Sequence, residues 1–228
     1  TVQAAFAFMA IGLALKAALF PLHAWLPNAY AFAPSVVTAF LAATATKVSI
    51  YVLIRTYFTI FGPEFSFEVM ALGPILMVLA ISAMLIGSTI AIFQDDIKRL
   101  LAYSSVAQIG YMMLGIAFAT VLGVTGGMLH MFNHALMKGA LFLALGCMFY
   151  RTGSVSIEAM RGLGQRMPWT MAAIVAGGLS LIGVPLTVGF VSKWYLLLAA
   201  IDSGMWWISI FILVASLLAI IYVWRLVE

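Results

Sequence analysis

Four lysines and two histidines are the residues of this sequence that could move protons. They stand inside long apolar stretches, whereas the seven acidic residues fall in loops or at the ends of those stretches. A lysine near the centre of a bilayer costs at least about 2.5 to 3.5 kcal/mol on insertion scales, so lysines without a local carboxylate need a purpose. Proton transfer supplies one, because a poorly solvated ammonium is loaded or unloaded by a small change in nearby charge. The lysines are Lys16, Lys47, Lys138 and Lys193.

The two histidines share a helical spacing with one of these lysines. His130, His134 and Lys138 stand at i, i+4 and i+8, so they stack on one helix face, with Asn133 at its border. This register favours a proton relay over two unrelated core histidines. It does not suit a bis-histidine haem, because two histidines of one helix cannot flank one iron and His23 is expected in a loop.

Composition places these residues in a membrane. Of 228 residues, 65% are hydrophobic and 8% charged, and the mean hydropathy is +1.17. A soluble surface needs more charge, and the basic balance therefore does not indicate nucleic-acid binding. The single cysteine, Cys147, excludes an internal disulfide, a thiolate-bound iron–sulfur cluster and a cysteine-based zinc site. We expect no cofactor and no metal.

The elements that must position the relay are long helices. Continuously apolar runs indicate helices and exclude the alternating strands of a barrel. The prediction is an all-α, polytopic membrane bundle of about seven transmembrane helices. The expected spans are 2–20, 35–58, 69–93, 103–122, 125–150, 168–200 and 205–227.

Two of the spans are expected to be discontinuous. The stretch 168–200 would be about 50 Å long as a straight helix, which exceeds the membrane. Gly183, Pro185 and Gly189 interrupt it just before Lys193, and Pro21 follows Lys16 in a related way. Paired, interrupted segments are typical of repeat transporters, whose freed carbonyls face a polar cavity.

Loop charges predict the orientation. With seven crossings, the loops around His23, 95–99 and 151–166 and the C-terminal end share one face. That face holds Lys98, Arg99, Arg151, Arg161, Arg166 and Arg225, and the other holds Arg55. The positive-inside rule then puts the C-terminal end in the cytoplasm and the N-terminal end outside. The chain opens at Thr1 in an apolar stretch, so we expect it to be a piece of a longer membrane protein.

Six ordered segments carry a family resemblance: 16–30 (KAALFPLHAWLPNAY), 33–34, 95–105 (DDIKRLLAYSS), 108–111, 130–142 and 183–193. They resemble the antiporter-like subunits shared by Mrp cation/proton antiporters, respiratory complex I and membrane-bound hydrogenases. The resemblance implies an inverted-repeat transporter fold. Residues 1–58 would be the last two helices of the first repeat, and 69–228 the second five-helix repeat, with its discontinuous helix at 168–200.

The resemblance also implies roles for the titratable residues. Lys16 matches the lysine of the first broken helix, and Lys47 a bridging position between two half-channels. His130, His134 and Lys138 match the central helix of the second repeat, and Lys193 the end position on the second broken helix. The family's glutamate partner of Lys16 would precede Thr1.

Asn28, Tyr30 and Lys193 depart from many complex I members and favour a part of an Mrp Na⁺/H⁺ antiporter that is similar to its D-type component, in a bacterial or archaeal plasma membrane. The alternatives are a proton-pumping subunit of NADH:quinone oxidoreductase or of a membrane-bound hydrogenase, and a non-conducting scaffold. A retinal protein is disfavoured because the seventh span lacks a lysine. The expected partners are other integral-membrane subunits, the lipid bilayer, protons and possibly Na⁺. The chain would have no redox active site of its own, though it could belong to a redox-driven enzyme complex.

Overall fold

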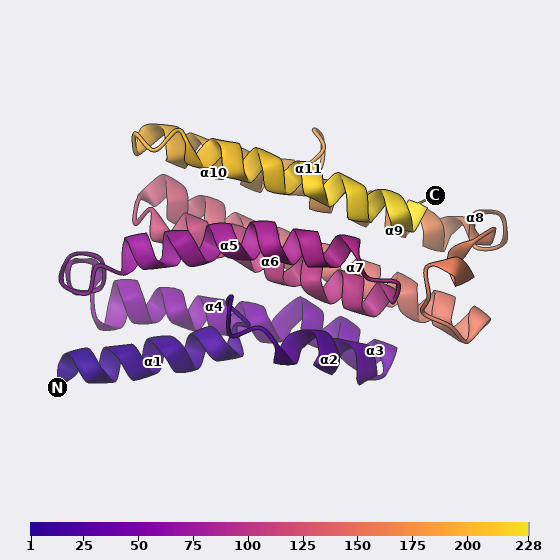
Figure 1. Cartoon of the computed structure of the whole chain (residues 1–228), viewed down its shortest axis with the longest axis horizontal. Coiled ribbons are helices and arrows are strands. Elements are labelled where there is room, and N and C mark those ends of the chain that lie inside the picture. Colours follow the sequence, from indigo (N-terminus) through magenta and orange to yellow (C-terminus); the bar gives the residue numbers. More distant parts are fainter. Residues whose placement is uncertain (228) are drawn as a thin grey trace.

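The computed structural model describes residues 1–227 as a bundle of long helices in three tiers (Figure 1). The lowest tier holds α1 (Val2–Lys16), α2 (Trp25–Phe32), α3 (Ser35–Phe40), η1 (Leu41–Ala45), α4 (Thr46–Arg55) and η2 (Thr56–Ile60). The middle tier holds α5 (Leu72–Ile92), α6 (Ile97–Ala117) and α7 (Val121–Thr152), and the upper tier α9 (Pro168–Ile182), α10 (Val188–Asp202) and α11 (Ile208–Val227). Short segments η3 (Glu64–Val69), η4 (Glu158–Met160) and α8 (Leu163–Arg166) join them. The predicted all-α bundle is confirmed.

Among the described residues, five helical segments are long and apolar enough to cross a membrane: Ser35–Ile60, Leu72–Ile92, Ile97–Ala117, Val121–Thr152 and Ile208–Val227. The pairs α1–α2 and α9–α10 each lie end to end in Figure 1 and supply two further, interrupted crossings. The predicted seven crossings and two discontinuous helices are therefore found. The assignment of 1–58 and 69–228 to two repeats stays a prediction.

The first crossing corrects one expectation. The sequence predicts that it ends at Phe20, with His23 in a loop at the membrane surface. Instead α1 ends at Lys16, and after residues 17–24 the chain continues in the same direction as α2 (Figure 1). The break, which contains Pro21, therefore lies within the crossing, and Trp25 Nε1 donates across it to Leu15 O at 2.9 Å.

The start of α6 is a second correction. The sequence predicts a loop at 95–99, but α6 begins at Ile97 because Asp96 Oδ1 caps it by accepting from the amide of Arg99 at 2.8 Å. Lys98 is consequently buried, and its Nζ donates to Ala33 O at 2.8 Å. This lysine ties the end of the first crossing to α6.

The second break falls close to the predicted position, with one exception. Gly183 ends α9 in the left-handed conformation (φ +87°), and Pro185 lies in the connection to α10. Gly189, predicted as part of the break, instead lies in the first turn of α10. It packs directly on the backbone of Ser180, where a side chain would have no room. Its small size brings the two half-helices together.

Glycines also set the distance between α6 and α7. A Cβ on Gly115 would lie 2.6 Å from Gly123 O and 2.8 Å from the Cα of Gly127. Because both contacts are backbone atoms, α6 and α7 can approach this closely only without a side chain. This contact brings α7 against α6, which is almost wholly buried in the centre of the bundle.

We therefore expect Gly115→Ala to lower the free energy of unfolding by about 1 to 3 kcal/mol through overpacking. Heat-induced unfolding of the solubilised complex, followed by tryptophan fluorescence, measures the effect. Gly139→Ala is the matched control, because its Cβ would meet only Ala43 Cβ at 3.6 Å. Equal stability of the two variants would contradict this account of the α6–α7 contact.

Candidate functional site

The central element of the site is α7. Its N-terminus is capped by Thr120 and its C-terminus by Gly153 in the left-handed conformation. His130, His134 and Lys138 point into the bundle and are fully buried, and the two imidazole rings lie parallel with centroids 6.4 Å apart. The stacking predicted from their spacing is present. Their role in proton transfer stays a prediction.

His130 is held from both sides. Its Nε2 lies 2.8 Å from Gln108 Oε1 on α6, and its Nδ1 lies 2.8 Å from Ser192 Oγ on α10. Gln108 Nε2 donates to Leu181 O at 3.5 Å, which turns Oε1 toward the imidazole. Nε2 must therefore carry a hydrogen, and Nδ1 of the neutral ring accepts from the Ser192 hydroxyl.

The Ser192 hydroxyl has a second acceptor. Its Oγ lies 3.1 Å from Gly189 O in the first turn of α10. When His130 takes up a second proton, Nδ1 becomes a donor, and Ser192 can accept from it while turning its own hydrogen to Gly189 O. Both protonation states of His130 therefore keep two hydrogen bonds, as a relay residue requires.

Lys193 lies beside the second helix break, where it binds backbone carbonyls. Its Nζ donates to Leu181 O at 3.0 Å and Ile182 O at 2.8 Å, the last carbonyls of α9. It also donates to Ser216 Oγ on α11 at 3.0 Å and lies 4.5 Å from the centroid of the Tyr111 ring. The negative end of a helix and an aromatic face thus stabilise a buried ammonium.

Lys138 and Lys47 are also bound to oxygen atoms. Lys138 Nζ donates to Leu101 O at 2.7 Å and to Ser104 Oγ at 2.6 Å on α6. Lys47 Nζ donates to Ala42 O within η1, a π-helical segment next to α7. π-Helical turns of this kind often mark functional positions. The structure therefore places Lys47 at a distortion in its own crossing helix.

His134 differs from its neighbours because neither ring nitrogen has a hydrogen-bond partner in the described part of the chain, although the side chain is fully buried. It lies one helical turn from both His130 and Lys138. Asn133 beside it donates to Val188 O at 2.7 Å and so joins α7 to the start of α10. An imidazole with both nitrogens free can accept and donate a proton at the middle of the line.

Lys16 is the one predicted relay residue that the structure does not bring to this line. It ends α1 beside the first break, but its side chain is exposed on the surface of the described chain. The other five predicted residues, Lys47, His130, His134, Lys138 and Lys193, are at most 6% exposed.

Carboxylates take no part in this line. Within residues 1–227 the single ion pair joins Arg225 to Asp95 at the end of the bundle, at 2.9 Å. In the same residues no group of three histidine, cysteine or acidic side chains could hold a metal ion. The buried bases are therefore solvated by carbonyls, hydroxyls, an amide and an aromatic ring.

Sequence reasoning missed several residues that connect the line: Gln108, Ser104, Tyr111 and Ser216. Three of them, Ser104, Gln108 and Tyr111, are polar residues of the otherwise apolar α6. Polar side chains inside a membrane helix are the signal that could have identified them. Ser216 offers a similar but weaker signal in α11.

Comparisons with known proteins agree with this geometry. The transmembrane family described as NADH:quinone oxidoreductase/Mrp antiporter matches residues 1–219. NADH-quinone oxidoreductase subunit N of Desulforudis audaxviator is 45% identical over 224 residues, which are 98% of this chain and 44% of the relative. The D component of the Na⁺/H⁺ antiporter of Alkalihalophilus pseudofirmus is 36% identical over 187 residues, which are 82% of this chain and 37% of the relative.

Among solved structures, a chain of the Mrp complex from a Dietzia species superposes with a TM-score of 0.93 and 33% identity, covering 99% of this chain and 41% of that one. The chain thus spans less than half the length of these curated relatives and of this structural neighbour.

The Gln108 contact gives a prediction for the tautomer of His130. Gln108→Leu removes the acceptor of the Nε2 hydrogen, and a buried unpaired donor costs about 1 to 3 kcal/mol. The neutral ring is then expected to change to the Nδ1–H tautomer, which donates to Ser192. Nitrogen-15 chemical shifts of histidine-labelled protein measure the change.

Ser105→Ala is the control, because Ser105 Oγ bonds only to Leu101 O of its own helix. Unaltered imidazole shifts in Gln108→Leu would show that Gln108 does not set the tautomer.

Proposed function

We propose a function from one premise: the chain belongs to the NADH:quinone oxidoreductase/Mrp antiporter transmembrane family. On this premise it is an antiporter-like, proton-translocating part of a multisubunit membrane complex, with other integral-membrane subunits as its partners. The observation that carries the proposal is the buried line of five titratable bases between α4 and α10. A structural bundle gains nothing from four such residues in α7 and α10 without carboxylates.

Proton movement follows the hydrogen bonds. Lys193 and His130 are joined through Leu181 O and the Gln108 amide, and Ser192 adjoins both residues along α10. His134 and Lys138 continue the line along α7, one turn at a time, toward Lys47. Each transfer needs a donor and an acceptor within hydrogen-bond reach or one water apart. Lys16 would couple this line to the preceding half-channel, as the family resemblance implies.

The finer assignment within the family has two candidates. Asn28, Tyr30 and Lys193 predict a role like that of the D component of an Mrp antiporter, and the TM-score of 0.93 with the Mrp complex chain supports it. A redox-driven complex is supported by the 45% identity with NADH-quinone oxidoreductase subunit N, against 36% with the antiporter component. Mass spectrometry of the chains that copurify, with NADH-driven and Na⁺-driven proton flux measured in the same vesicles, distinguishes the two.

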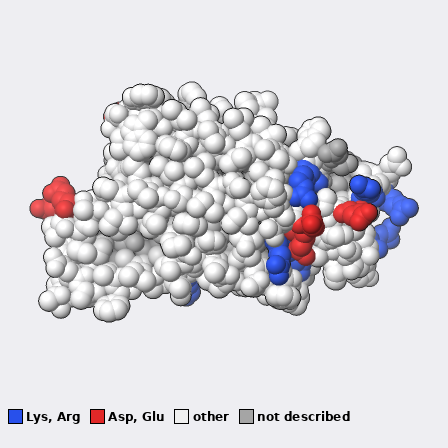
Figure 2. Space-filling model, in the orientation of Figure 1, with Lys and Arg blue, Asp and Glu red and all other residues white. Residues whose placement is uncertain are grey.

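We also propose an orientation in a prokaryotic plasma membrane, with the N-terminal end outside and the C-terminal end in the cytoplasm. Figure 2 supports it: the basic side chains on this face gather, together with acidic ones, at the end of the bundle near α8, apart from a patch at the lower edge. The opposite end carries only acidic side chains on this face. Positive residues are retained on the cytoplasmic side during insertion.

Lys138→Ala is expected to slow proton translocation at least about 100-fold, because a positioned acid–base group contributes about that much. Proton flux into vesicles containing the complete complex measures it, at equal abundance of the assembled subunit. Lys98→Ala is the matched control, since Lys98 is buried but binds Ala33 O away from the line. Wild-type flux in Lys138→Ala would favour the non-conducting scaffold.

Lys193→Met tests the far end of the line. The variant is expected to stop translocation, and to lose about 1 to 3 kcal/mol of stability because two carbonyls of α9 lose their donor. Lys193→Glu is expected to retain part of the flux, because a protonated carboxyl can still donate to one carbonyl and release its proton. If Lys193→Met translocates at the wild-type rate, Lys193 is not part of the path.

A further inference from the structure

A groove between α9 and α11 has the shape of a lipid site. At the end of the bundle it opens as a cavity of about 500 Å³ lined by Met171 and Val175 of α9, the end of α11, Gly162 and Arg161. It continues as an apolar groove of about 280 Å³ between Leu179 of α9 and Trp224 of α11. Val175 and Val227 line both parts, so the two are continuous.

The groove has the length of one membrane leaflet. Its lining runs along α9 from Met171 to Val184, just past Gly183, where the helix is interrupted within the membrane. Thirteen helical steps correspond to about 20 Å. Half of the hydrocarbon core is about 15 Å thick, so the groove reaches from the interface to the middle of the bilayer. The apolar part therefore fits an acyl chain of a surrounding lipid.

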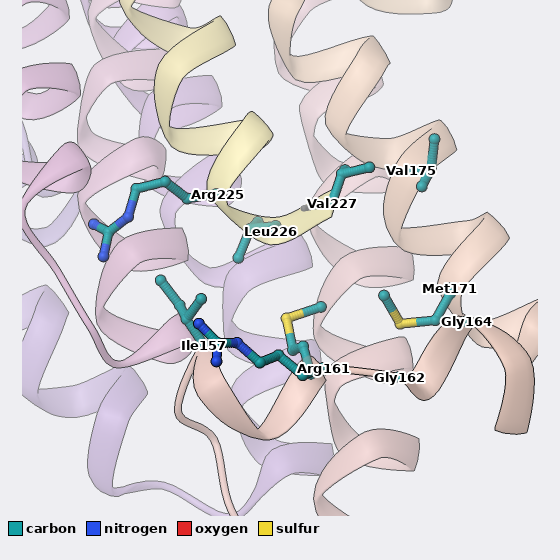
Figure 3. Close-up of a pocket in the computed structure, with 10 residues that line it drawn as sticks. Ile157, Arg161, Gly162, Gly164, Met171, Val175, Arg225, Leu226 and Val227 are labelled. Atoms are coloured by element: carbon teal, nitrogen blue, oxygen red, sulfur yellow. The ribbon is translucent and has the colours of Figure 1, made fainter.

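The wide end of the groove is basic. Arg225 and Arg161 lie on one side of the cavity, with Met171 and Val175 on the other (Figure 3). Arg225 is fixed by Gln94 O at 3.0 Å and Asp95 Oδ1 at 2.9 Å. Arg161 is exposed, and its guanidinium makes no hydrogen bond or ion pair within the part of the chain that the structure describes. A free guanidinium beside a fixed one suits a phosphate group.

Acidic groups stand next to these arginines. A second polar cavity of about 470 Å³ shares Arg161, Arg225 and Ile157 with the first and adds Asp95 and Glu158. Both carboxylates are exposed. Positive groups that face the lipid groove and negative groups just beyond them match a phosphate followed by a primary ammonium.

We propose that this site binds one molecule of phosphatidylethanolamine. One acyl chain lies in the groove between α9 and α11, the phosphate binds Arg161 and Arg225, and the ammonium donates to Asp95 and Glu158. A choline headgroup has no N–H to donate to these carboxylates, and a glycerol headgroup has no cation. The site therefore selects the ethanolamine headgroup over both. The proposal stands apart from the relay, because none of these residues lies on it.

The test uses the complete complex reconstituted in phosphatidylcholine vesicles that contain a photoactivatable phosphatidylethanolamine with a diazirine in its acyl chain. After illumination, mass spectrometry locates the labelled peptides. Label is expected on α9 between Val175 and Val184 and on α11. Arg161→Gln is expected to reduce this label about fivefold, the effect of one basic residue near a lipid surface.

Matched variants and probes separate the parts of the site. Arg166→Gln removes a basic residue near the same end that does not line the cavity, and it should leave the label unchanged. Leu179→Trp should reduce the label by filling the groove. Glu158→Gln should lessen the preference for the ethanolamine probe over phosphatidylcholine and phosphatidylglycerol probes.

Three outcomes overturn the proposal. Equal labelling by all three probes in the wild-type complex would mean a nonselective lipid surface. Equal loss of label in Arg161→Gln and Arg166→Gln would mean that general surface charge, not this cavity, attracts the probe. Absence of label on α9 and α11 would mean that another subunit covers the groove.

Discussion

Buried ammonium groups and interrupted helices depend on each other in this structure. A lysine deep in a membrane bundle needs several oxygen atoms around it, and a helix that stops inside the membrane leaves carbonyls that need donors. Lys193 meets both needs at the end of α9, where it binds the carbonyls of Leu181 and Ile182. Lys47 does the same at the π-helical turn of its own crossing, through Ala42 O. Neither the charge nor the distortion would be stable alone.

The positions of the other elements follow from the need to place oxygen atoms around α7. Helix α6 lies closest to it because glycines allow backbone contact, and α6 therefore contributes Leu101 O, Ser104 and Gln108. The half-helices α9 and α10 pack on the opposite side and contribute Ser192. A bundle held only by apolar contacts could slide or rotate its helices. Here the directional hydrogen bonds fix the register of α6, α7 and α10.

Polar and apolar needs divide the molecule by depth. Near the middle of the crossings the charged groups face inward, and the outward faces of α9 and α11 are apolar. At the end near α8, arginines and carboxylates lie on the surface, with Arg225 joined to Asp95. The groove between α9 and α11 connects the two zones, since it begins among charged residues and ends beside the break in α9. A two-part surface of this kind matches an amphiphile better than a soluble ligand.

Local sequence patterns are enough to predict the class of fold and most of the titratable line. Continuous apolar runs require helices in a membrane, and the four-residue spacing of His130, His134 and Lys138 requires one face whatever the neighbours are. The surroundings of each base, in contrast, depend on contacts between distant segments. Gln108 and Ser192 meet His130 from α6 and α10, 22 and 62 residues away, and no local pattern encodes such distances. The folded chain also places His23 in a break and Lys98 in a helix, because a half-helix beyond Pro21 and the Asp96 cap extend two helical crossings past the ends that hydropathy indicates. Local periodicity fixes which residues share a face, whereas contacts between distant segments fix which atoms that face meets.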